Sequence, residues 1–260
     1  MKFGVCCGED KFESVARAGY DYVEFPFCRF SAMTDEEFRL FLLKLKDCGL
    51  KSEACNSFFT PDIKLIGEDV NLLNIESYVK KGMERAAAAG CEVAVIGSGG
   101  ARRIPENFDP IKAKEQFCEI LELCGNIAGS YNIRIAIEPL NAGETNFINT
   151  VADGIDICRS VSNSNVGVLA DFYHIYKSKE TLEAVESAGD LLFHVHLARP
   201  DDDRGIPYEP SDMEACIKWN EALNKCGYNK RISFEAIYAP DFDGDIKKGK
   251  SALKIFGMQS

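Results

Sequence analysis

The chain of 260 residues has no run of about 20 apolar residues, the length that a membrane-spanning helix requires. Its apolar fraction of 46% is nevertheless ordinary for a globular protein, so a sizeable core can form. Residues 1–5 lead directly into a strand-like pattern, without the apolar region of a secretory signal peptide. We therefore expect a cytoplasmic protein that does not interact with membranes.

The sequence also lacks the cysteine spacings of a disulfide framework or a zinc site. Its 11 cysteines include no C-x-x-C pair and no Cys/His zinc pattern. Disulfide-rich proteins are typically small and secreted, whereas this chain is long. Because free cysteine is among the residues most often buried, we interpret these cysteines as reduced thiols that act as small core residues.

A concentrated basic segment is absent as well. The chain has 30 Lys and Arg residues against 41 Asp and Glu residues, which gives a net charge of −11. The basic residues are scattered among acidic ones, as in residues 44–53. Proteins that bind nucleic acid usually present a basic face to the phosphates. We therefore do not expect nucleic acid as a partner.

Short apolar strand-like segments alternate with longer segments of helical period, which is typical of βαβ units and a parallel sheet. The predicted strands cover residues 3–6, 22–25, 51–55, 93–96, 134–137, 166–170, 193–197 and 232–234. The predicted helices cover residues 12–18, 35–48, 74–89, 111–131, 150–160, 179–187, 212–225 and 245–256. A glycine follows the last apolar turn of several helices, as expected for a helix C-cap; these are Gly19, Gly49, Gly90 and Gly227.

Eight such units predict an α/β fold, a single-domain (β/α)8 TIM barrel, because closure leaves no exposed sheet edge. An open, doubly wound sheet is the alternative, but the first strand-to-helix turn, residues 6–10, lacks the glycine-rich dinucleotide fingerprint. We interpret the glycine cluster at 97–100 as a tight turn near the site. No linker or low-complexity segment interrupts the chain, so residues 1–260 are taken as one domain.

Acidic residues and a histidine fall at or near the ends of five predicted strands: Glu24, Glu138, Asp171, His196 and Glu235. In a parallel barrel these ends meet at one mouth. Carboxylates at the ends of apolar strands are costly to desolvate unless they are paired or bound to a cation. A divalent metal would remove the repulsion among the last four residues of this set. For Glu24 the sequence leaves a structural salt bridge, a rim position and a catalytic role open.

Histidine is scarce, and all three copies lie in the region of the sixth and seventh predicted strands: His174, His194 and His196. His194 and His196 point to the same side of their strand, because side chains alternate. His196 is nearer the mouth, so we predict it as the metal ligand and assign His194 to the core or to a supporting position. Oxygen and nitrogen donors of this kind suit Mn²⁺, Mg²⁺ or Co²⁺ better than a thiolate-rich zinc centre does.

These motifs resemble those of the xylose-isomerase-like TIM barrels, in particular the D-tagatose 3-epimerase and hydroxypyruvate isomerase branch. The similarity follows the element order of essentially the whole chain and is sharpest from the fifth strand onward. The segments that carry it are 137–141 (Ile-Glu-Pro-Leu-Asn), 144–150 (Glu-Thr-Asn-Phe-Ile-Asn-Thr), 171–174 (Asp-Phe-Tyr-His), 194–197 (His-Val-His-Leu) and 234–235 (Phe-Glu).

The resemblance implies a set of roles for individual residues. Glu138 and Glu235 would be the catalytic acid and base on opposite faces of the substrate, and Glu144 and His174 would hold substrate hydroxyls. The implied metal ligands are Glu138, Asp171, His196 and Glu235. The ion would be Mn²⁺ first, with Mg²⁺ or Co²⁺ as alternatives and Zn²⁺ left open.

One segment departs from the family pattern. The epimerases place an arginine soon after the metal histidine, and Arg204, its counterpart here, comes two residues later than that spacing. We assign Arg204 to substrate binding. The three aspartates at 201–203 are either an unusual substrate-facing surface or a solvated loop.

The implied activity is that of a divalent-metal-dependent sugar isomerase or epimerase, first of all a ketose 3-epimerase. A metal that bridges a ketone and its neighbouring hydroxyl would stabilise a cis-enediolate, while two glutamates move the proton. Alternatives on the same scaffold are an aldose–ketose or hydroxypyruvate isomerase, and a metal-dependent dehydratase (lyase) of keto-sugars or inososes.

Two further alternatives lie outside this class. A nuclease of the endonuclease IV type would need more histidines, and a non-catalytic sugar-binding barrel would bind ligand without turnover. The expected partner is a small sugar or keto-sugar, and the resemblance implies a homo-oligomer, a dimer or tetramer. Which sugar is used, and whether it is phosphorylated, stays open.

Overall fold

The computed structural model describes residues 1–201, 203–238 and 240–259, and its centre is a closed barrel of parallel strands. Each strand pairs with the next in the chain, and β1 pairs with β8. The strands are β1 (Lys2–Cys6), β2 (Tyr22–Pro26), β3 (Ala54–Asn56), β4 (Val93–Ile96), β5 (Arg134–Ile137), β6 (Val166–Asp171), β7 (Leu192–Leu197) and β8 (Arg231–Phe234). The predicted (β/α)8 TIM barrel is confirmed.

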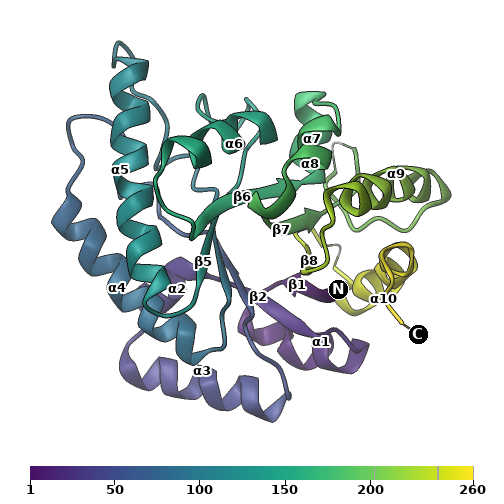
Figure 1. Ribbon diagram of the computed structural model, residues 1–260. Helices are drawn as coiled ribbons and strands as arrows, with labels where there is room; N and C mark the ends of the chain where they lie inside the picture. Colours follow the sequence, from purple (N-terminus) through teal and green to yellow (C-terminus); the bar gives the residue numbers. More distant parts are fainter. Residues whose placement is uncertain (202, 239, 260) are drawn as a thin grey trace.

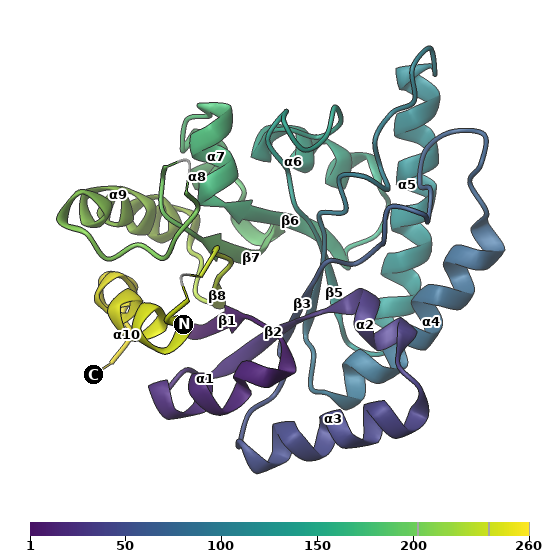
Figure 2. The ribbon, with the colours of Figure 1, turned by 180° about the vertical axis from the view of Figure 1, so that it is seen from behind.

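Helices surround the barrel, as Figures 1 and 2 show from opposite sides. They are α1 (Phe12–Ala18), α2 (Phe27–Ala32), α3 (Asp35–Asp47), α4 (Leu72–Ala88), α5 (Pro110–Gly129), α6 (Val151–Ser160), α7 (Phe172–Ser178), α8 (Glu183–Ser187), α9 (Pro210–Cys226) and α10 (Phe242–Leu253). Short 3-10 helices are η1 (Glu9–Lys11), η2 (Gly189–Leu191) and η3 (Lys254–Phe256). The N and C marks lie near α10 in both views.

Local sequence accounts for where several helices begin and end. Thr34 and Thr150 form capping boxes with Glu37 and Asp153, and each such cap stabilises a helix by about 1 kcal/mol. The four glycines predicted after helices all adopt left-handed backbone conformations, with φ of 75°, 67°, 89° and 73° in chain order. Glycine takes this conformation without the steric penalty of a Cβ atom.

The largest differences from the predicted elements concern one strand and three short helices. The third strand, predicted at 51–55, is paired only over Ala54–Asn56, while residues 51–53 approach it as extended chain. The helix predicted at 179–187 begins only at Glu183, because Lys179 adopts a left-handed conformation that ends α7. Two short helices, α2 and α7, were not predicted.

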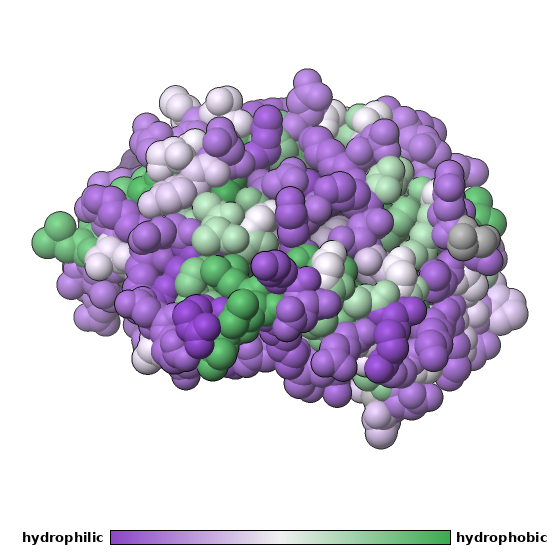
Figure 3. All heavy atoms as spheres, turned by 90° about the horizontal axis from the view of Figure 1, so that it is seen from below, coloured by the Kyte–Doolittle hydropathy of each residue, from purple (hydrophilic) through white to green (hydrophobic). Residues whose placement is uncertain are grey.

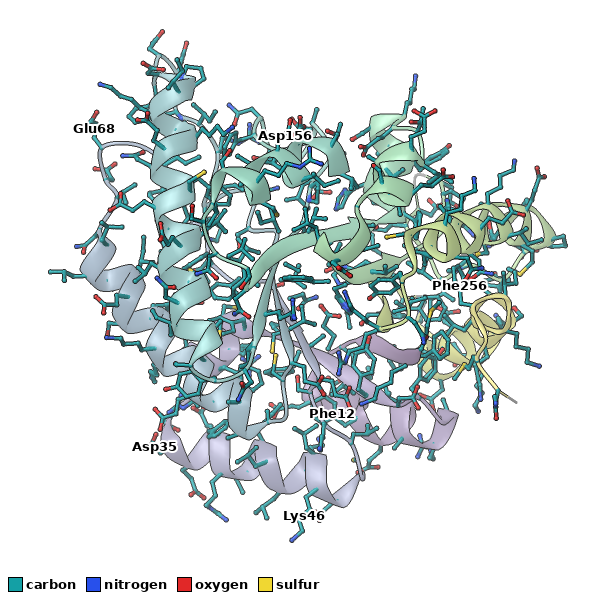
Figure 4. All side chains as sticks on the ribbon, in the orientation of Figure 1. Phe12, Asp35, Lys46, Glu68, Asp156 and Phe256 are labelled. Carbon is teal, nitrogen blue, oxygen red and sulfur yellow. The ribbon has the colours of Figure 1, made fainter. Side chains whose placement is uncertain are left out.

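The apolar core of the barrel has two parts. The larger layer lies between strands and helices and includes Phe12, Phe25 and Phe41, whose rings contact one another. Side chains also fill the space inside the ring of strands (Figure 4). The smaller, inner cluster comprises Tyr22, Ala54, Val93, Val95, Ala136, Leu169 and Phe193.

The surface seen from below in Figure 3 is mostly hydrophilic, with hydrophobic residues in smaller patches. Over the described residues, no helix combines the length and the apolar character needed to cross a membrane. All 11 cysteines are free, and none of them is exposed. This agrees with the interpretation of the cysteines as small, packed thiols.

Candidate metal and sugar site

The four predicted metal ligands come together at the carboxyl ends of the strands. Glu138 follows β5, Asp171 ends β6, His196 lies in β7 and Glu235 follows β8. One ligand atom from each residue lies within 4.8 Å of all the others. Glu138, Asp171 and His196 are buried, and Glu235 is partly buried. Four residues that are distant in the sequence therefore form one compact group.

The glycine cluster after β4 lies against the Glu138 carboxylate. A Cβ atom at Gly97 would collide with Oε2 of Glu138, so this close approach requires glycine. Ser98 has a positive φ of 44°, and its carbonyl accepts hydrogen bonds from the backbone of Ala101 and Arg102. The cluster is thus a tight turn beside the site, as predicted.

Arg102, which the sequence reasoning missed, supports the same glutamate from behind. Its side chain is fully buried, and Nη2 donates to the Glu138 carbonyl oxygen at 2.8 Å. Longer hydrogen bonds reach the carbonyls of Ile96 and Ile148, at 3.4 Å each. Burial lowers the pKa of Arg102 to about 10, so the guanidinium stays charged at neutral pH. Nothing in the local sequence distinguishes this arginine from its exposed neighbour, Arg103.

His196 faces the site with one nitrogen and the barrel interior with the other. Its Nδ1 lies 3.2 Å from Glu235 Oε2 and 3.4 Å from Glu138 Oε1. Its Nε2 lies 2.9 Å from Glu24 Oε1. Burial opposes a charge on this ring, but the Glu24 and Glu235 carboxylates outweigh burial and hold the pKa of His196 well above its usual value.

Glu24 lies inside the barrel rather than at the rim. It is fully buried, and Oε2 is 2.8 Å from His194 Nε2 and accepts a hydrogen bond from Ser233 Oγ at 2.5 Å. Burial penalises the carboxylate, yet His196 and His194 outweigh this effect and place the pKa of Glu24 well below its usual value. Of the alternatives left open, the rim position is therefore wrong, and a buried ion pair is present.

The protein groups give the two proposed acid/base glutamates different proton affinities. Burial, reinforced by the nearby Glu235 charge, raises the pKa of Glu138. At Glu235 burial acts in the same direction, but His196 and Arg204 outweigh it and lower the pKa to about 2. When the pKa values of two neighbouring carboxyl groups differ in this way, one group can act as an acid and the other as a base.

Asn141 links the two residues predicted to hold substrate hydroxyls. Its Nδ2 lies 2.9 Å from Glu144 Oε1 and 2.9 Å from His174 Nδ1. The Asn141 backbone N–H also donates to His174 Nδ1, at 3.3 Å. That acceptor role leaves the hydrogen of the neutral His174 ring on Nε2. This nitrogen has no hydrogen-bond partner among the described residues and lies 3.6 Å from Asp171 Oδ2. The ring can therefore donate to a bound molecule.

Arg204 reaches the site despite its longer spacing. Its Nη2 lies 2.9 Å from Asp171 Oδ2 and 2.6 Å from Glu235 Oε2. The Arg199 backbone N–H donates to the Gly205 carbonyl at 2.7 Å, which closes the base of the loop that precedes the Arg204 side chain. Asp201 accepts the backbone N–H groups of residues 203 and 204 and so shapes this turn. Asp202, the middle residue of the acidic run, lies outside the described residues.

Asn56 is a further site residue that the sequence reasoning missed. It ends β3, and its Nδ2 donates to Glu235 Oε1 at 3.0 Å. Its own Oδ1 is buried and has no hydrogen-bond partner in the part of the chain that the structure describes. The signal was present in principle, because Asn56 follows the predicted third strand directly and a polar residue at a strand end is expected to face the mouth.

The fold and this group of residues define a TIM barrel with a carboxylate-rich polar site at the carboxyl ends of its strands. The chain matches the model of the xylose isomerase-like TIM barrel family over residues 12–255, and it belongs to that family.

A probable ketose 3-epimerase from Synechocystis sp. is 27% identical over 165 residues, which cover 61% of this chain and 56% of that protein. The chain thus spans little more than half the length of that relative. A D-psicose 3-epimerase from Agrobacterium fabrum is 26% identical over 233 residues, or 86% of this chain and 77% of the relative. A crystal structure of a D-psicose 3-epimerase in the presence of D-fructose superimposes with a TM-score of 0.82. The superposition includes 99% of this chain and 100% of the epimerase chain, with 20% sequence identity. This similarity shows the fold alone.

Proposed function

We propose that this protein is a divalent-metal-dependent isomerase or epimerase of sugars, first of all a ketose 3-epimerase. The observation that carries the proposal is the convergence of Glu138, Asp171, His196 and Glu235 within 4.8 Å at the barrel mouth. The similarity to proteins named as ketose and D-psicose 3-epimerases supports it. The substrate would be a small sugar or keto-sugar.

The donor set fits a divalent cation. The pKa of Glu138 is raised first by burial and then by repulsion from the Glu235 charge, and a divalent cation would relieve the repulsion among these carboxylates. Oxygen donors with one imidazole suit Mn²⁺ first, then Mg²⁺ or Co²⁺, with Zn²⁺ as a further alternative. A cation bound here would polarise the substrate oxygens and acidify the C–H bond between them.

The proposed roles of the side chains follow from their protonation and placement. One of the two glutamates, Glu138 or Glu235, would remove the proton, and the other would return one from the opposite face of the substrate. In the reverse direction the two exchange roles. His174 Nε2 and Glu144 would hold substrate hydroxyls, and the Arg204 guanidinium would donate to a substrate oxygen.

Metal binding is expected to stabilise the fold, because a ligand that binds only the native state adds its binding free energy to stability. At a Mn²⁺ concentration about 100 times the dissociation constant, the gain is about 2.7 kcal/mol. For a chain of this size that corresponds to a rise in melting temperature of roughly 5–10 °C. Differential scanning fluorimetry of chelator-treated and Mn²⁺-loaded protein measures this shift. The Asp171→Asn variant should lose most of it, and identical melting curves for the wild-type protein under both conditions would contradict the metal site.

The reaction is tested by incubating the Mn²⁺-loaded protein with free ketohexoses and ketopentoses and identifying the products by NMR. A C3 epimer, absent when chelator is present, is the expected product. An aldose would indicate aldose–ketose isomerisation, and loss of water would indicate a dehydratase. Binding of a sugar without any product would favour the non-catalytic barrel.

We further propose that residues 1–260 form one domain and that the protein is cytoplasmic and assembles into a dimer or tetramer. Light scattering coupled to size-exclusion chromatography gives the molar mass in solution. A mass of about 29 kDa, that of one 28.8 kDa chain, would rule out the oligomer.

A further inference from the structure

We infer that Glu24 is a positioning residue for the metal centre: it fixes which ring nitrogen of His196 faces the site and keeps that nitrogen free to bind the cation. The inference rests on the proposed function in so far as His196 is a metal ligand. Glu24 comes from β2, on a part of the barrel that supplies none of the four proposed ligands. Its side chain is fully buried.

The geometry of the His196 ring assigns its proton. Nε2 lies 2.9 Å from Glu24 Oε1, whereas Nδ1 faces Glu138 and Glu235. An ionised carboxylate only accepts hydrogen bonds, so Nε2 carries a hydrogen in this contact. Nδ1 also faces carboxylates, so without a cation it can carry a hydrogen too; a cation at the proposed position would replace that hydrogen, while the Nε2 hydrogen stays directed at Glu24. A carboxylate behind a histidine also makes the ligating nitrogen more basic.

Glu24 is itself held by a hydrogen-bonded network across the barrel. Ser233 Oγ donates to Glu24 Oε2 at 2.5 Å and is 2.8 Å from Tyr22 Oη. His194 Nε2 is 2.8 Å from the same carboxylate oxygen. All of these residues are fully buried. The network gives a role to His194, the second histidine of β7. His194 donates a hydrogen bond to Glu24 and does not belong to the four-residue group at the mouth.

The Glu24→Gln substitution separates this role from simple packing, because it keeps the shape of the side chain. Glu24 faces three hydrogen-bond donors, on His194, His196 and Ser233. An amide offers one oxygen and one NH2 group, so it cannot accept from all three. If the NH2 group faces His196, the ring proton moves to Nδ1 and blocks the ligand atom. If the amide oxygen faces His196, the tautomer is kept but the negative charge that supports it is lost.

Both arrangements weaken metal binding, and Mn²⁺ titration followed by electron paramagnetic resonance measures the change. We expect the dissociation constant of Glu24→Gln to rise about 10- to 100-fold, the usual effect of losing such a supporting group. The matched control is Tyr22→Phe, which removes a hydroxyl from the same buried network without contact to His196. It should bind Mn²⁺ within about twofold of wild type, because the Glu24–His196 contact is kept.

The second measurement is 15N NMR of the imidazole rings in protein loaded with a diamagnetic cation, Mg²⁺ or Zn²⁺, in which Nδ1 of His196 would have given up its hydrogen to ligate the ion. Selective labelling is simple, since the chain has only three histidines. We expect wild-type His196 to carry its hydrogen on Nε2 and Glu24→Gln to change the proton position or the shift of Nδ1. This readout would not respond to a merely structural role of Glu24.

The outcomes separate the two proposals. Unchanged Mn²⁺ affinity and unchanged His196 signals in a folded Glu24→Gln variant would overturn the positioning role while leaving the metal centre in place. Failure of the wild-type protein to bind any divalent cation would overturn the metal centre and this role with it. Weaker Mn²⁺ binding in Glu24→Gln supports the role even when no sugar tested is converted.

Discussion

Replacing Glu235 with Gln lowers turnover about 10²- to 10⁴-fold, the range expected when a positioned acid/base group is removed. Glu235 is ionised at neutral pH, with a pKa of about 2, and its carboxylate lies among the proposed metal ligands. Glutamine has almost the same volume but cannot take a proton from carbon. The variant should remain folded, as judged by circular dichroism and by its melting temperature. Its metal content should be measured as well, because an amide is a weaker ligand.

A buried glutamate at the opposite end of the barrel is the control for this experiment. Glu53 pairs with Lys2 at 2.6 Å and with Arg231 at 2.8 Å, the first residues of β1 and β8. The Glu53→Gln variant should lose stability but keep the turnover number of the folded protein. Near-wild-type turnover in a folded, metal-loaded Glu235→Gln variant would show that Glu235 is not a catalytic acid or base.

Replacing Arg102 with Met is expected to lower the free energy of unfolding by about 3 kcal/mol. The fully buried guanidinium donates to three backbone carbonyls, on Ile96, Glu138 and Ile148, and methionine donates to none. The Glu138 carbonyl would be left without a partner, which costs about 1–3 kcal/mol, whereas the Ile96 and Ile148 carbonyls would each lose a second hydrogen bond and keep one from the backbone. Removal of a partly desolvated charge offsets part of the sum. The melting temperature should fall by roughly 6–12 °C.

The neighbouring arginine provides a matched control. Arg103 is exposed and makes one hydrogen bond to the protein, to the Glu144 carbonyl at 2.9 Å. Arg103→Met should change the free energy of unfolding by no more than about 0.5 kcal/mol, as is usual for surface positions. Equal melting temperatures for the two variants would show that Arg102 does not hold β4, β5 and the following loop together.

Sequence pattern alone predicted the barrel and the group at its mouth. Strand periodicity placed β4 and β5 at their observed limits, and the rule that parallel strands end at one face brought Glu138, Asp171, His196 and Glu235 together. The sequence pattern did not predict two short helices. α2 (Phe27–Ala32) is too short to show a helical period, and α7 begins where Asp171, the last residue of β6, caps the Tyr173 backbone N–H.

The supporting contacts could not be predicted in the same way. The residues that face Glu24 across the barrel are set by how the closed barrel places β2 opposite β7 and β8. This placement is a property of the three-dimensional fold and cannot be read from the sequence. The position of Arg102 depends on which backbone carbonyls come together behind β4 and β5, and no spacing in the sequence records this. Asn56 was within reach of the strand-end rule, because it directly follows the predicted third strand, as Glu138 and Glu235 directly follow theirs.

Hydrogen exchange at substrate carbon tests the central proposal most directly. The Mn²⁺-loaded protein is incubated in D₂O with a panel of free ketohexoses and ketopentoses, and the sugars are followed by NMR. The proposed mechanism predicts deuterium at C3 of at least one ketose together with its C3 epimer, both abolished by chelation and by Glu235→Gln. Deuterium only at C1 or C2 would indicate aldose–ketose isomerisation instead. Absence of exchange in every sugar, with the metal bound, would contradict the proposed epimerase.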